Sequence, residues 1–368
     1  MSNTILETIY WFPVKGLPGI SLPHTHLADS QGIPHDRRYA ITRGVEASGD
    51  WMPSRYFYIN SYVDGMLDFT VEDYSPDHVR YSNRLGQSIE LKFDDPRSID
   101  KANRQLSGFI RNLPVDLDLP APKITSRRDG GNLWDYLDTP LSIINTSSVD
   151  AIGRALDVSL DPLRFRGNLN LSGMAAWDEL NLMGKRIRIG EAEIEVIRPI
   201  VRCPTPGVNP ANGDRDIDFA KAMPEAFGHA YCGMYAFTAK PGRVSASDTM
   251  EIIGDASISL VDALAEAEEY ERMPRKMIVK TCETGSDPTR LTLGATGPWP
   301  IPAAKPGQRL RFHLGANAWT TEYVAATSPG HYHFEIGKSE TGDPVTETLR
   351  TGYQPGDELV VSGPFGRG

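Results

Sequence analysis

Short segments in which apolar and polar residues alternate dominate the chain, and this period-two pattern predicts β-strands. The clearest examples are residues 56–59, 78–81, 88–93, 186–189 and 193–197. Turn-forming residues separate the second segment from the third and the fourth from the fifth, which predicts two β-hairpins. We therefore predict a mainly β (α+β) fold with many short strands.

Three stretches show helical patterns instead. Apolar residues recur at helical spacing in residues 98–113 and 147–157, which predicts two amphipathic surface helices. Residues 259–273 are rich in acidic side chains and end before Pro274, which predicts a solvated helix. We expect this helix to join two units, and we place the main domain boundary there.

The charge differs on the two sides of this boundary. Residues 274–368 contain 10 basic and 9 acidic side chains, whereas residues 1–273 carry a net charge of −11. Residues 308–314 and 357–362 each follow a Pro-Gly turn and have a strand pattern. The second part is therefore predicted to be another β unit.

Size, charge and cysteine content exclude several classes of protein. A chain of 368 residues is long enough for two or three packed units, and its net charge of −10 disfavours nucleic acid as a partner. No segment approaches the ~18 consecutive apolar residues of a membrane span, and the N-terminus lacks a signal-peptide pattern, so we expect a cytoplasmic protein. The widely spaced Cys203, Cys232 and Cys282 exclude a disulfide framework and a zinc site built on CxxC pairs.

The stretch around Cys203 has the pattern of a functional thiol. The apolar residues 194–201 run into Cys203, and three prolines and a glycine follow it within seven residues. Such a loop is stiff, so we expect Cys203 in a fixed position at a strand end, where Arg202 would favour the thiolate. A thiolate in this setting suits a nucleophile or a soft-metal ligand. From the residues around it alone, a buried packing role is the favoured interpretation for Cys203, as it is for Cys232 and Cys282.

Basic side chains recur near other polar motifs. Arg164 and Arg166 precede Asn168, and guanidinium groups suit the recognition of a phosphate or a polar heterocycle. Further cations follow short predicted strands near the N-terminus: Lys15, Arg37 and Arg38. Taken singly, each of these charges is better explained by a solvated surface.

Taken in order, these residues resemble a MOSC-domain protein that binds the molybdenum cofactor. Residues 10–16 and 32–38 resemble the MOSC N-terminal β-barrel. The segments that resemble the MOSC domain proper are residues 139–144, 165–168, 177–180, 202–203 and 208–210. The likeness covers about residues 1–255 and implies MOSC β-barrel domains.

The resemblance implies a role for each residue that matches a family motif. Cys203 would be the catalytic residue and the protein's ligand to molybdenum, while other motif residues would hold the pterin and its phosphate. The implied cofactor-binding residues are Lys15, Arg37, Arg38, Ser142, Arg166, Asn168, Asp178, Arg202 and Asn209. One position departs from the family pattern, because Gly16 stands where a small polar residue often follows the motif lysine.

Residues 275–368 resemble the Greek-key flavin-binding barrel of the ferredoxin–NADP reductase family, which implies FAD or FMN in this part of the chain. That family anchors flavin with an arginine two residues before a tyrosine and a serine or threonine after it. Here the segment is Thr321–Val324, so both polar anchors are missing, and we predict weak flavin binding. The segment 342–346 stands where that family holds the flavin pyrophosphate. The chain ends where a nicotinamide-binding domain would begin, so the resemblance implies a truncated reductase fusion.

The resemblances together predict a domain order. The MOSC N-terminal β-barrel region would span residues 1–120, and the MOSC domain residues 121–256. A helical linker would span residues 257–274, and the ferredoxin reductase-type FAD-binding-like barrel residues 275–368.

The nearest functional relatives implied by the resemblance are the amidoxime-reducing component and its bacterial counterparts. The chain would then be a molybdenum-dependent oxidoreductase that transfers oxygen from N-hydroxylated or related N–O substrates to molybdenum. Electrons would arrive through a flavin or an iron–sulfur reductase/ferredoxin module in cis or in trans. Two alternatives stay open: a sulfur carrier that uses a persulfide on Cys203, and a non-catalytic scaffold that docks an electron-transfer partner.

Overall fold

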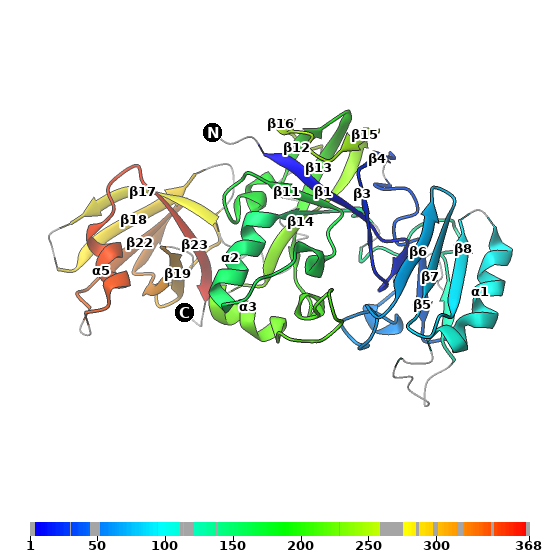
Figure 1. Cartoon of the computed structure of the whole chain (residues 1–368). Coiled ribbons are helices and arrows are strands. Elements are labelled where there is room, and N and C mark those ends of the chain that lie inside the picture. Colours follow the sequence, from blue (N-terminus) through cyan, green and yellow to red (C-terminus); the bar gives the residue numbers. More distant parts are fainter. Residues whose placement is uncertain are drawn as a thin grey trace. The chain divides into compact units, whose positions relative to one another are not determined.

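The computed structural model shows a chain built mainly of β-strands (Figure 1). The residues that it describes are 4–29, 31–44, 52–93, 95–110, 113, 121–136, 138–227, 229–257, 275–284, 287–296, 301–314, 319–339 and 342–365. All structural statements below concern these residues.

Contacts along the backbone divide the chain into two compact units. Unit 1 comprises the described residues of Met1–Val149, Leu160–Ala220 and Cys232–Ser259. Unit 2 comprises those of Asp150–Ser159, Lys221–Tyr231 and Leu260–Gly368. The two predicted MOSC regions both contribute to unit 1, and the boundary between them at residue 120 stays a prediction.

Unit 1 is organised around an eight-stranded sheet with the order β16-β12-β13-β14-β10-β11-β1-β3. Smaller sheets pair β15 with β4, β2 with β5 and β9, and β6 with β7 and β8. The strands are β1 (Ile5–Trp11), β2 (Val14–Lys15), β3 (Ile20–Leu22), β4 (His24–Leu27), β5 (Tyr39–Thr42), β6 (Thr70–Ser75), β7 (His78–Ser82), β8 (Ser88–Lys92), β9 (Lys123–Thr125), β10 (Leu141–Asn145), β11 (Leu169–Ser172), β12 (Lys185–Ile189), β13 (Ala192–Val201), β14 (Tyr231–Lys240), β15 (Gly242–Ser245) and β16 (Met250–Asp255).

Six helical segments are described with these strands, the first being the 3₁₀ segment η1 (Ser54–Tyr56). Helix α1 (Pro96–Phe109) begins after Asp95, whose carboxylate accepts from the backbone N–H of Arg97, and the helix packs against β8 and β9. Helix α2 (Thr146–Leu156) follows β10 and leads to the parallel strand β11. The remaining helices are the short 3₁₀ segments η2 (Pro162–Phe165), η3 (Asp178–Leu182) and η4 (Thr205–Gly207).

Strand β13 carries the chain to the candidate thiol. Nearly all of its side chains are buried, as expected for an inner strand covered on both faces. Its pairing with β12 ends at Glu195, and on its other side it neighbours β14. The strand ends at Val201, and the chain then turns sharply into η4.

Unit 2 contains a seven-stranded sheet with the order β20-β19-β23-β17-β18-β22-β21. Its strands are β17 (Arg275–Glu283), β18 (Thr289–Ala295), β19 (Arg309–His313), β20 (Trp319–Tyr323), β21 (Ala326–Ser328), β22 (His331–Ile336) and β23 (Glu358–Phe365). Helix α5 (Pro344–Thr351) precedes the last strand, and helix α3 (Phe219–Phe227) spans the division between the units. The core includes Phe312, Tyr332 and Phe334, all nearly inaccessible to solvent.

The structure contains most of the strands and helices that the sequence pattern predicted, together with many more that it did not predict. Both β-hairpins are confirmed as β7–β8 and β12–β13, and the predicted amphipathic helices are confirmed as α1 and α2. The predicted strand at residues 56–59 is wrong, because Ser54–Tyr56 form the 3₁₀ helix η1 and only Phe57 makes an isolated bridge. Phe57 and the adjacent Tyr58 are both buried, so this apolar run fills the core without the alternation of a paired strand.

Two helices, α3 and α5, have no counterpart in the sequence prediction. The helix predicted at residues 259–273 lies outside the described residues. Within the described part of the chain, no helix is both long enough and apolar enough to span a membrane.

Candidate functional site

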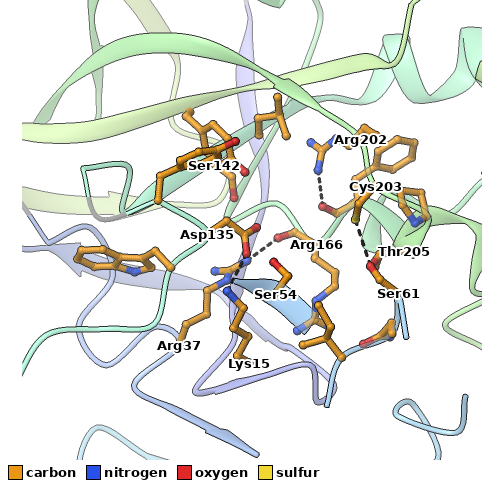
Figure 2. Close-up of a pocket in the computed structure, with 18 of the residues that line it drawn as sticks. Lys15, Arg37, Ser54, Ser61, Asp135, Ser142, Arg166, Arg202, Cys203 and Thr205 are labelled. Atoms are coloured by element: carbon orange, nitrogen blue, oxygen red, sulfur yellow. Dashed lines mark hydrogen bonds and ion pairs between the residues drawn. The ribbon is translucent and has the colours of Figure 1, made fainter. Parts of the chain in front are cut away.

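A polar cavity in unit 1 brings together most of the residues that the sequence singled out (Figure 2). Its volume is about 250 Å³. The candidate residues that line it are Lys15, Arg37, Ser142, Arg166, Asn168, Arg202 and Cys203. They come from both predicted MOSC regions, so the cavity is assembled by segments far apart in the sequence.

Cys203 is an exposed free thiol in this cavity, two residues beyond the end of β13. The loop that follows is closely packed: a Cβ on Gly207 would lie 2.1 Å from the carbonyl oxygen of Ile217, so only glycine allows this approach. An isolated bridge between Val208 and Arg215 closes the loop. The expected position of the thiol at a strand end, in a constrained loop, is therefore observed.

Two hydroxyl groups stand beside the thiol. The hydroxyl of Ser61 donates to Sγ of Cys203 at 3.4 Å and lies 2.6 Å from the hydroxyl of Thr205 (Figure 2). These contacts orient the Cys203 side chain. They also place two hydroxyl groups next to any ligand that binds its sulfur. Sequence reasoning missed Ser61, because it lies 142 residues from Cys203 and no local motif links them.

From its position beside Cys203, Arg202 was expected to favour the thiolate, but its guanidinium lies elsewhere. Its guanidinium donates to the backbone carbonyls of Cys232 at 2.7 Å and Phe165 at 2.9 Å. Among the described contacts, none joins this guanidinium to Sγ of Cys203. Arg202 thus ties the thiol loop to β14 and to the end of η2, which is a positioning role. Cys232 is fully buried, which raises the pKa of its thiol to about 12 and agrees with the expected packing role.

Lys15 lies in the cavity wall but already has partners. Its ammonium donates to Asp135 at 2.7 Å and to the carbonyl of Leu133 at 3.0 Å (Figure 2). Lys15 lowers the pKa of Asp135 to about 2, so this pair contributes no net charge at neutral pH. The neighbouring Gly16 has a φ of +89°, and a Cβ there would lie 2.4 Å from the carbonyl oxygen of Tyr58. This close backbone approach explains why the position next to Lys15 is a glycine.

Arg37 is held by a buried carboxylate. Its guanidinium forms a short ion pair with Asp36, donates to the carbonyl of Arg166 at 2.9 Å and lies 4.8 Å from the ring centroid of Phe12. Asp36 is completely buried and also accepts from the backbone N–H of Phe12. Burial raises the pKa of Asp36, whereas Arg37 opposes this shift. The positive charge of Arg37 is therefore largely balanced within the protein.

Arg166 is the cation that the cavity leaves without a counter-ion. Its guanidinium lies 4.4 Å from the centroid of the same Phe12 ring, and no described residue forms a hydrogen bond or an ion pair with its side chain. Burial, followed by the nearby Arg37, lowers the pKa of Arg166 to about 10, so it remains protonated at neutral pH. Because Lys15 and Arg37 are paired, Arg166 supplies the strongest attraction for an anionic ligand.

Asn168 and Ser142 organise the cavity wall from inside the fold. Oδ1 of Asn168 accepts from the hydroxyl of Ser142 at 2.9 Å and faces Nη1 of Arg37 at 3.4 Å. The amide of Asn168 also donates to the carbonyl of Tyr10 at 3.2 Å. Both residues are almost fully buried, so they join β1, β10 and β11 and orient Arg37.

Three predicted cofactor-binding residues do not line this cavity. Arg38 donates to the carbonyls of Gly130 and Gly131. Asp178 lies in η3, and the amide of Asn209 donates to Asp216 at 3.0 Å. We leave these three residues out of the proposed site, and a direct role in cofactor binding stays a prediction for each.

Buried polar atoms without partners mark the cavity as a ligand site. Four residues that line it each contain one buried nitrogen or oxygen that has no hydrogen-bond partner among the described residues: Asn60 Oδ1, Trp134 Nε1, Arg164 Nε and Arg202 Nη2. Leaving such atoms unsatisfied is unfavourable by about 1–3 kcal/mol each. The cavity therefore suits a polar ligand that supplies the missing hydrogen bonds.

The fold and the site thus define a class: a mainly β protein with an exposed thiol at the rim of a cationic cavity. Comparison with known families agrees, because residues 125–251, about a third of the chain, match the MOSC domain. The chain therefore contains a MOSC domain, and this part of the predicted resemblance is confirmed. The relationships to the amidoxime-reducing component and to ferredoxin–NADP reductase stay predictions.

One curated protein with a significant match is a molybdenum cofactor sulfurase from Caenorhabditis briggsae. It is 22% identical over 227 residues, which cover 58% of this chain and 30% of the sulfurase. The match thus spans less than a third of that relative's length.

Solved structures show more remote likenesses. The YuaD protein from Bacillus subtilis has 13% identity and a TM-score of 0.34, covering 68% of this chain and 97% of that one. YiiM from Geobacillus stearothermophilus has 15% identity and a TM-score of 0.27, covering 34% of this chain and 63% of that one. TM-scores this low do not establish a common fold.

The segment that the reductase resemblance aligns with a flavin pyrophosphate site carries negative charge in unit 2. The carboxylate of Asp343 accepts from the backbone N–H groups of Val345 and Thr346 at the start of α5, and it also accepts from the hydroxyl of Thr346. These bonds lower the pKa of Asp343, so it stays ionised. Burial raises the pKa of Glu322, and the negative charge of Asp343 adds to this effect.

We therefore predict that FAD and FMN are not retained when the protein is mixed with either flavin and passed through gel filtration. Asp343 occupies the helix N-terminus that would otherwise attract a phosphate. Asp343→Asn, which keeps an N-cap acceptor but removes the charge, should bind flavin more tightly than the wild type in a fluorescence titration. A stoichiometric yellow flavin in the purified wild-type protein would contradict this prediction.

Proposed function

We propose that the protein is a molybdenum-cofactor-dependent oxidoreductase that reduces N-hydroxylated or related N–O compounds. The observation that carries this proposal is the presence of one exposed thiol, Cys203, and one unpaired guanidinium, Arg166, in the same cavity of unit 1. The MOSC match and the similarity to a molybdenum cofactor sulfurase support the choice of cofactor.

The donor set of the cavity fits this cofactor, which combines a pterin, a dithiolene and a phosphate. The buried Trp134 Nε1 and Arg202 Nη2 lack partners, and pterin nitrogens and oxygens offer acceptors for such donors. Arg166 provides an uncompensated charge for the phosphate, while Cys203 offers the soft sulfur ligand that molybdenum accepts. The residues present therefore suit the group.

When bound, the cofactor supplies two-electron redox chemistry and acceptance of an oxygen atom. The protein's own residues bind and orient the reactants. Arg37, fixed by Asp36 and Asn168, keeps the wall next to Arg166 rigid. Ser61 and Thr205 place hydroxyl oxygens beside Cys203, where they can accept a hydrogen bond from the N–OH group of a substrate.

The overall reaction breaks the N–O bond of the substrate. The products are the N–H compound and water, and the balance requires two electrons and two protons. A reductase that contains flavin or an iron–sulfur centre, in cis or in trans, is the class of electron donor that we propose. The substrate is a small N-oxygenated molecule.

Metal and pterin analysis of protein from a host that makes the cofactor tests this proposal. We expect about one molybdenum and one pterin per chain. With a chemical reductant, the loaded protein should convert an N-hydroxylated compound into its N–H product. Protein that retains neither molybdenum nor pterin would refute the proposal.

The similarity to a molybdenum cofactor sulfurase favours a second candidate, a sulfur carrier. Cys203 is exposed, as a thiol that receives a persulfide from a donor and passes it on must be. The same purified protein distinguishes the two functions. Cyanide-releasable sulfur on Cys203 without molybdenum would favour the carrier, and molybdenum with reductase turnover would favour the oxidoreductase.

Replacing Arg166 separates ligand binding from stability. We predict that Arg166→Met lowers cofactor retention at least about tenfold, because a charge-assisted contact with the phosphate is lost. Its melting temperature should be unchanged or higher, because the substitution removes an unpaired, partly buried charge near Arg37. Inductively coupled plasma mass spectrometry and calorimetry measure the two effects.

Arg164→Met is the matched control for this prediction. Both oxygens of Asp216 accept from the Arg164 guanidinium, at 2.8 and 2.7 Å. This substitution removes a structural ion pair and should therefore lower the melting temperature. If Arg166→Met destabilised the protein as much as Arg164→Met while retaining molybdenum, Arg166 would be a structural residue.

A further inference from the structure

The aromatic ring of Phe12 contacts two arginines that line the Cys203 cavity. The guanidinium carbon of Arg37 lies 4.8 Å from the centroid of this ring, and that of Arg166 lies 4.4 Å from the same centroid. Both distances are within the range of about 6 Å in which the face of an aromatic ring attracts a cation. One uncharged side chain therefore contacts both cations.

The Phe12 ring is itself held firmly. Phe12 is completely buried in the segment between β1 and β2. Its backbone N–H donates to Asp36 at 2.9 Å, and its carbonyl accepts from the backbone N–H of Arg37 at 2.6 Å. A Cβ on Gly19 would lie 2.3 Å from the ring, so a glycine at that position leaves room for it. Two other segments of the chain thus fix the position of the ring.

Both arginines have a backbone conformation that residues other than glycine rarely adopt. Arg37 and Arg166 each have a φ of +53°, in the left-handed region. Such conformations are unfavourable, and they persist at ligand sites where the surrounding structure maintains them. Nη2 of Arg37 also donates to the carbonyl of Arg166 at 2.9 Å. The fold therefore keeps two like charges close together at the cavity.

A neighbouring arginine is supported in a different way. Arg164 precedes Arg166 by two residues, and both carboxylate oxygens of Asp216 accept from its guanidinium, at 2.8 and 2.7 Å. A carboxylate fixes a guanidinium but also cancels its charge. The Phe12 ring has no net charge, so it attracts the Arg166 guanidinium and leaves its positive charge available. A guanidinium over a ring keeps its N–H donors in its own plane, where an oxyanion can accept from them.

We propose that Phe12 is a positioning residue whose ring holds the Arg166 guanidinium at the cavity, oriented for a phosphate group, without neutralising it. In the part of the chain that the structure describes, no hydrogen bond or ion pair holds this side chain, so the ring is its support. Arg37 is already fixed by Asp36 and Asn168, so loss of the ring should affect Arg166 most. The source of the phosphate group, a pterin cofactor, rests on the proposed function.

Fluorinated phenylalanines at position 12 test the face of the ring directly. Fluorine withdraws electrons from this face, which weakens its attraction for a cation but changes the size of the ring little. Full-length protein from a host that does not make the cofactor would carry mono-, di- or trifluorophenylalanine in place of Phe12. Isothermal titration calorimetry with inorganic phosphate measures the affinity of the site. The matched control is the same series in place of Phe312, a buried phenylalanine of the unit 2 core.

The phosphate affinity should fall with each added fluorine at position 12, and it should be about tenfold lower for the trifluorinated ring. The same series at Phe312 should leave the affinity unchanged. Phe12→Leu should also weaken phosphate binding, and adding it to Arg166→Met should cause no further loss, because both substitutions act through the same guanidinium. In a host that makes the cofactor, Phe12→Leu should retain less molybdenum than Phe312→Leu.

Three results would overturn the inference: no phosphate binding by the wild type, an affinity that stays constant along the fluorine series at position 12, or an equal fall along the series at Phe312. Equal molybdenum retention by Phe12→Leu and Phe312→Leu would refute the assignment of the phosphate group to the cofactor. Failure of the proposed function looks different. A fluorine-sensitive phosphate site in a protein that retains neither molybdenum nor pterin would support the role of Phe12 and refute the oxidoreductase proposal.

Discussion

Replacing Cys203 with serine is expected to abolish molybdenum-dependent reductase activity, with a loss on the order of a thousandfold or more, as for the removal of other groups essential to catalysis. Serine has nearly the same size but offers a poor ligand for a soft metal. Because the Cys203 side chain is exposed at the cavity, the substitution leaves the core intact and the melting temperature should stay within about 1 °C of the wild type. Steady-state turnover of an N-hydroxylated compound and calorimetry measure both outcomes.

Cys282→Ser is the matched control, since that thiol is partly buried in unit 2. It should retain full activity, which shows that the effect is specific to Cys203. Turnover of Cys203→Ser at the wild-type rate would end the proposal that this thiol binds the cofactor. A variant that unfolds instead would reveal a structural role that the exposure of Cys203 does not support.

The position of the thiol could be predicted because its causes are local. A continuous apolar run predicts strand β13, and the prolines that follow allow neither a strand nor a helix to continue. The left-handed backbone at Arg166, with a φ of +53°, is equally local, but nothing in the sequence beside it indicates where its side chain points. Local patterns thus predict which strands and loops carry the site residues. They do not predict which charged side chains are paired within the fold.

Long-range pairing decides which cations remain available for a ligand. Lys15 and its partner Asp135 are 120 residues apart, and Arg37 and Asn168 are 131 residues apart. Before folding, Lys15, Arg37 and Arg166 look equivalent. After folding, two of them have internal acceptors, and only Arg166 has none among the described residues. No spacing rule within one segment predicts this difference.

The direction of a side chain is a second property that sequence neighbours do not determine. Arg202 precedes Cys203, yet its guanidinium binds the carbonyls of Cys232 and Phe165. Gly233 makes room for it, because a Cβ there would lie 2.9 Å from Nη2 of Arg202. The glycine is therefore part of the reason that the arginine lies behind the thiol loop, and its role is visible only once β14 is in place.

Acidification is expected to destabilise unit 2 through two histidines, of which His229 is buried and His313 partly buried. His229 and His313 have ring centroids 6.4 Å apart, and the side chain of His313 lies 2.8 Å from the hydroxyl of Ser362 on β23. Burial lowers the pKa of His313 to about 4, and it lowers the pKa of His229 well below its usual value of 6.5; the charge of Arg311 adds to both shifts. Both rings are therefore neutral in the folded protein at pH 7.

Acid lowers the free energy of unfolding because the unfolded chain binds protons more readily than the folded protein. Between pH 6.5 and 4 the histidines of the unfolded chain become protonated, whereas His313 in the folded protein does not. The free energy of unfolding therefore falls as the pH falls, by about 3 kcal/mol over this range from His313 alone. His229 adds to the loss in the same direction, because its pKa is shifted the same way. Above about pH 7.5 the histidines of the unfolded chain are also almost entirely neutral, so neither contributes a pH dependence there.

Amide hydrogen exchange of the β19 and β23 peptides in urea, at pH 7 and pH 4.5, measures this loss within unit 2 after correction for intrinsic exchange rates. His313→Gln keeps a hydrogen-bonding side chain next to Ser362 but cannot be protonated, so it should lose much of the pH dependence. The matched control is His24→Gln on β4, at an exposed position of unit 1. This substitution should leave the pH dependence of β19 and β23 unchanged. Equal stability of the wild-type β19 and β23 at both pH values would show that these histidines are not held neutral by the fold.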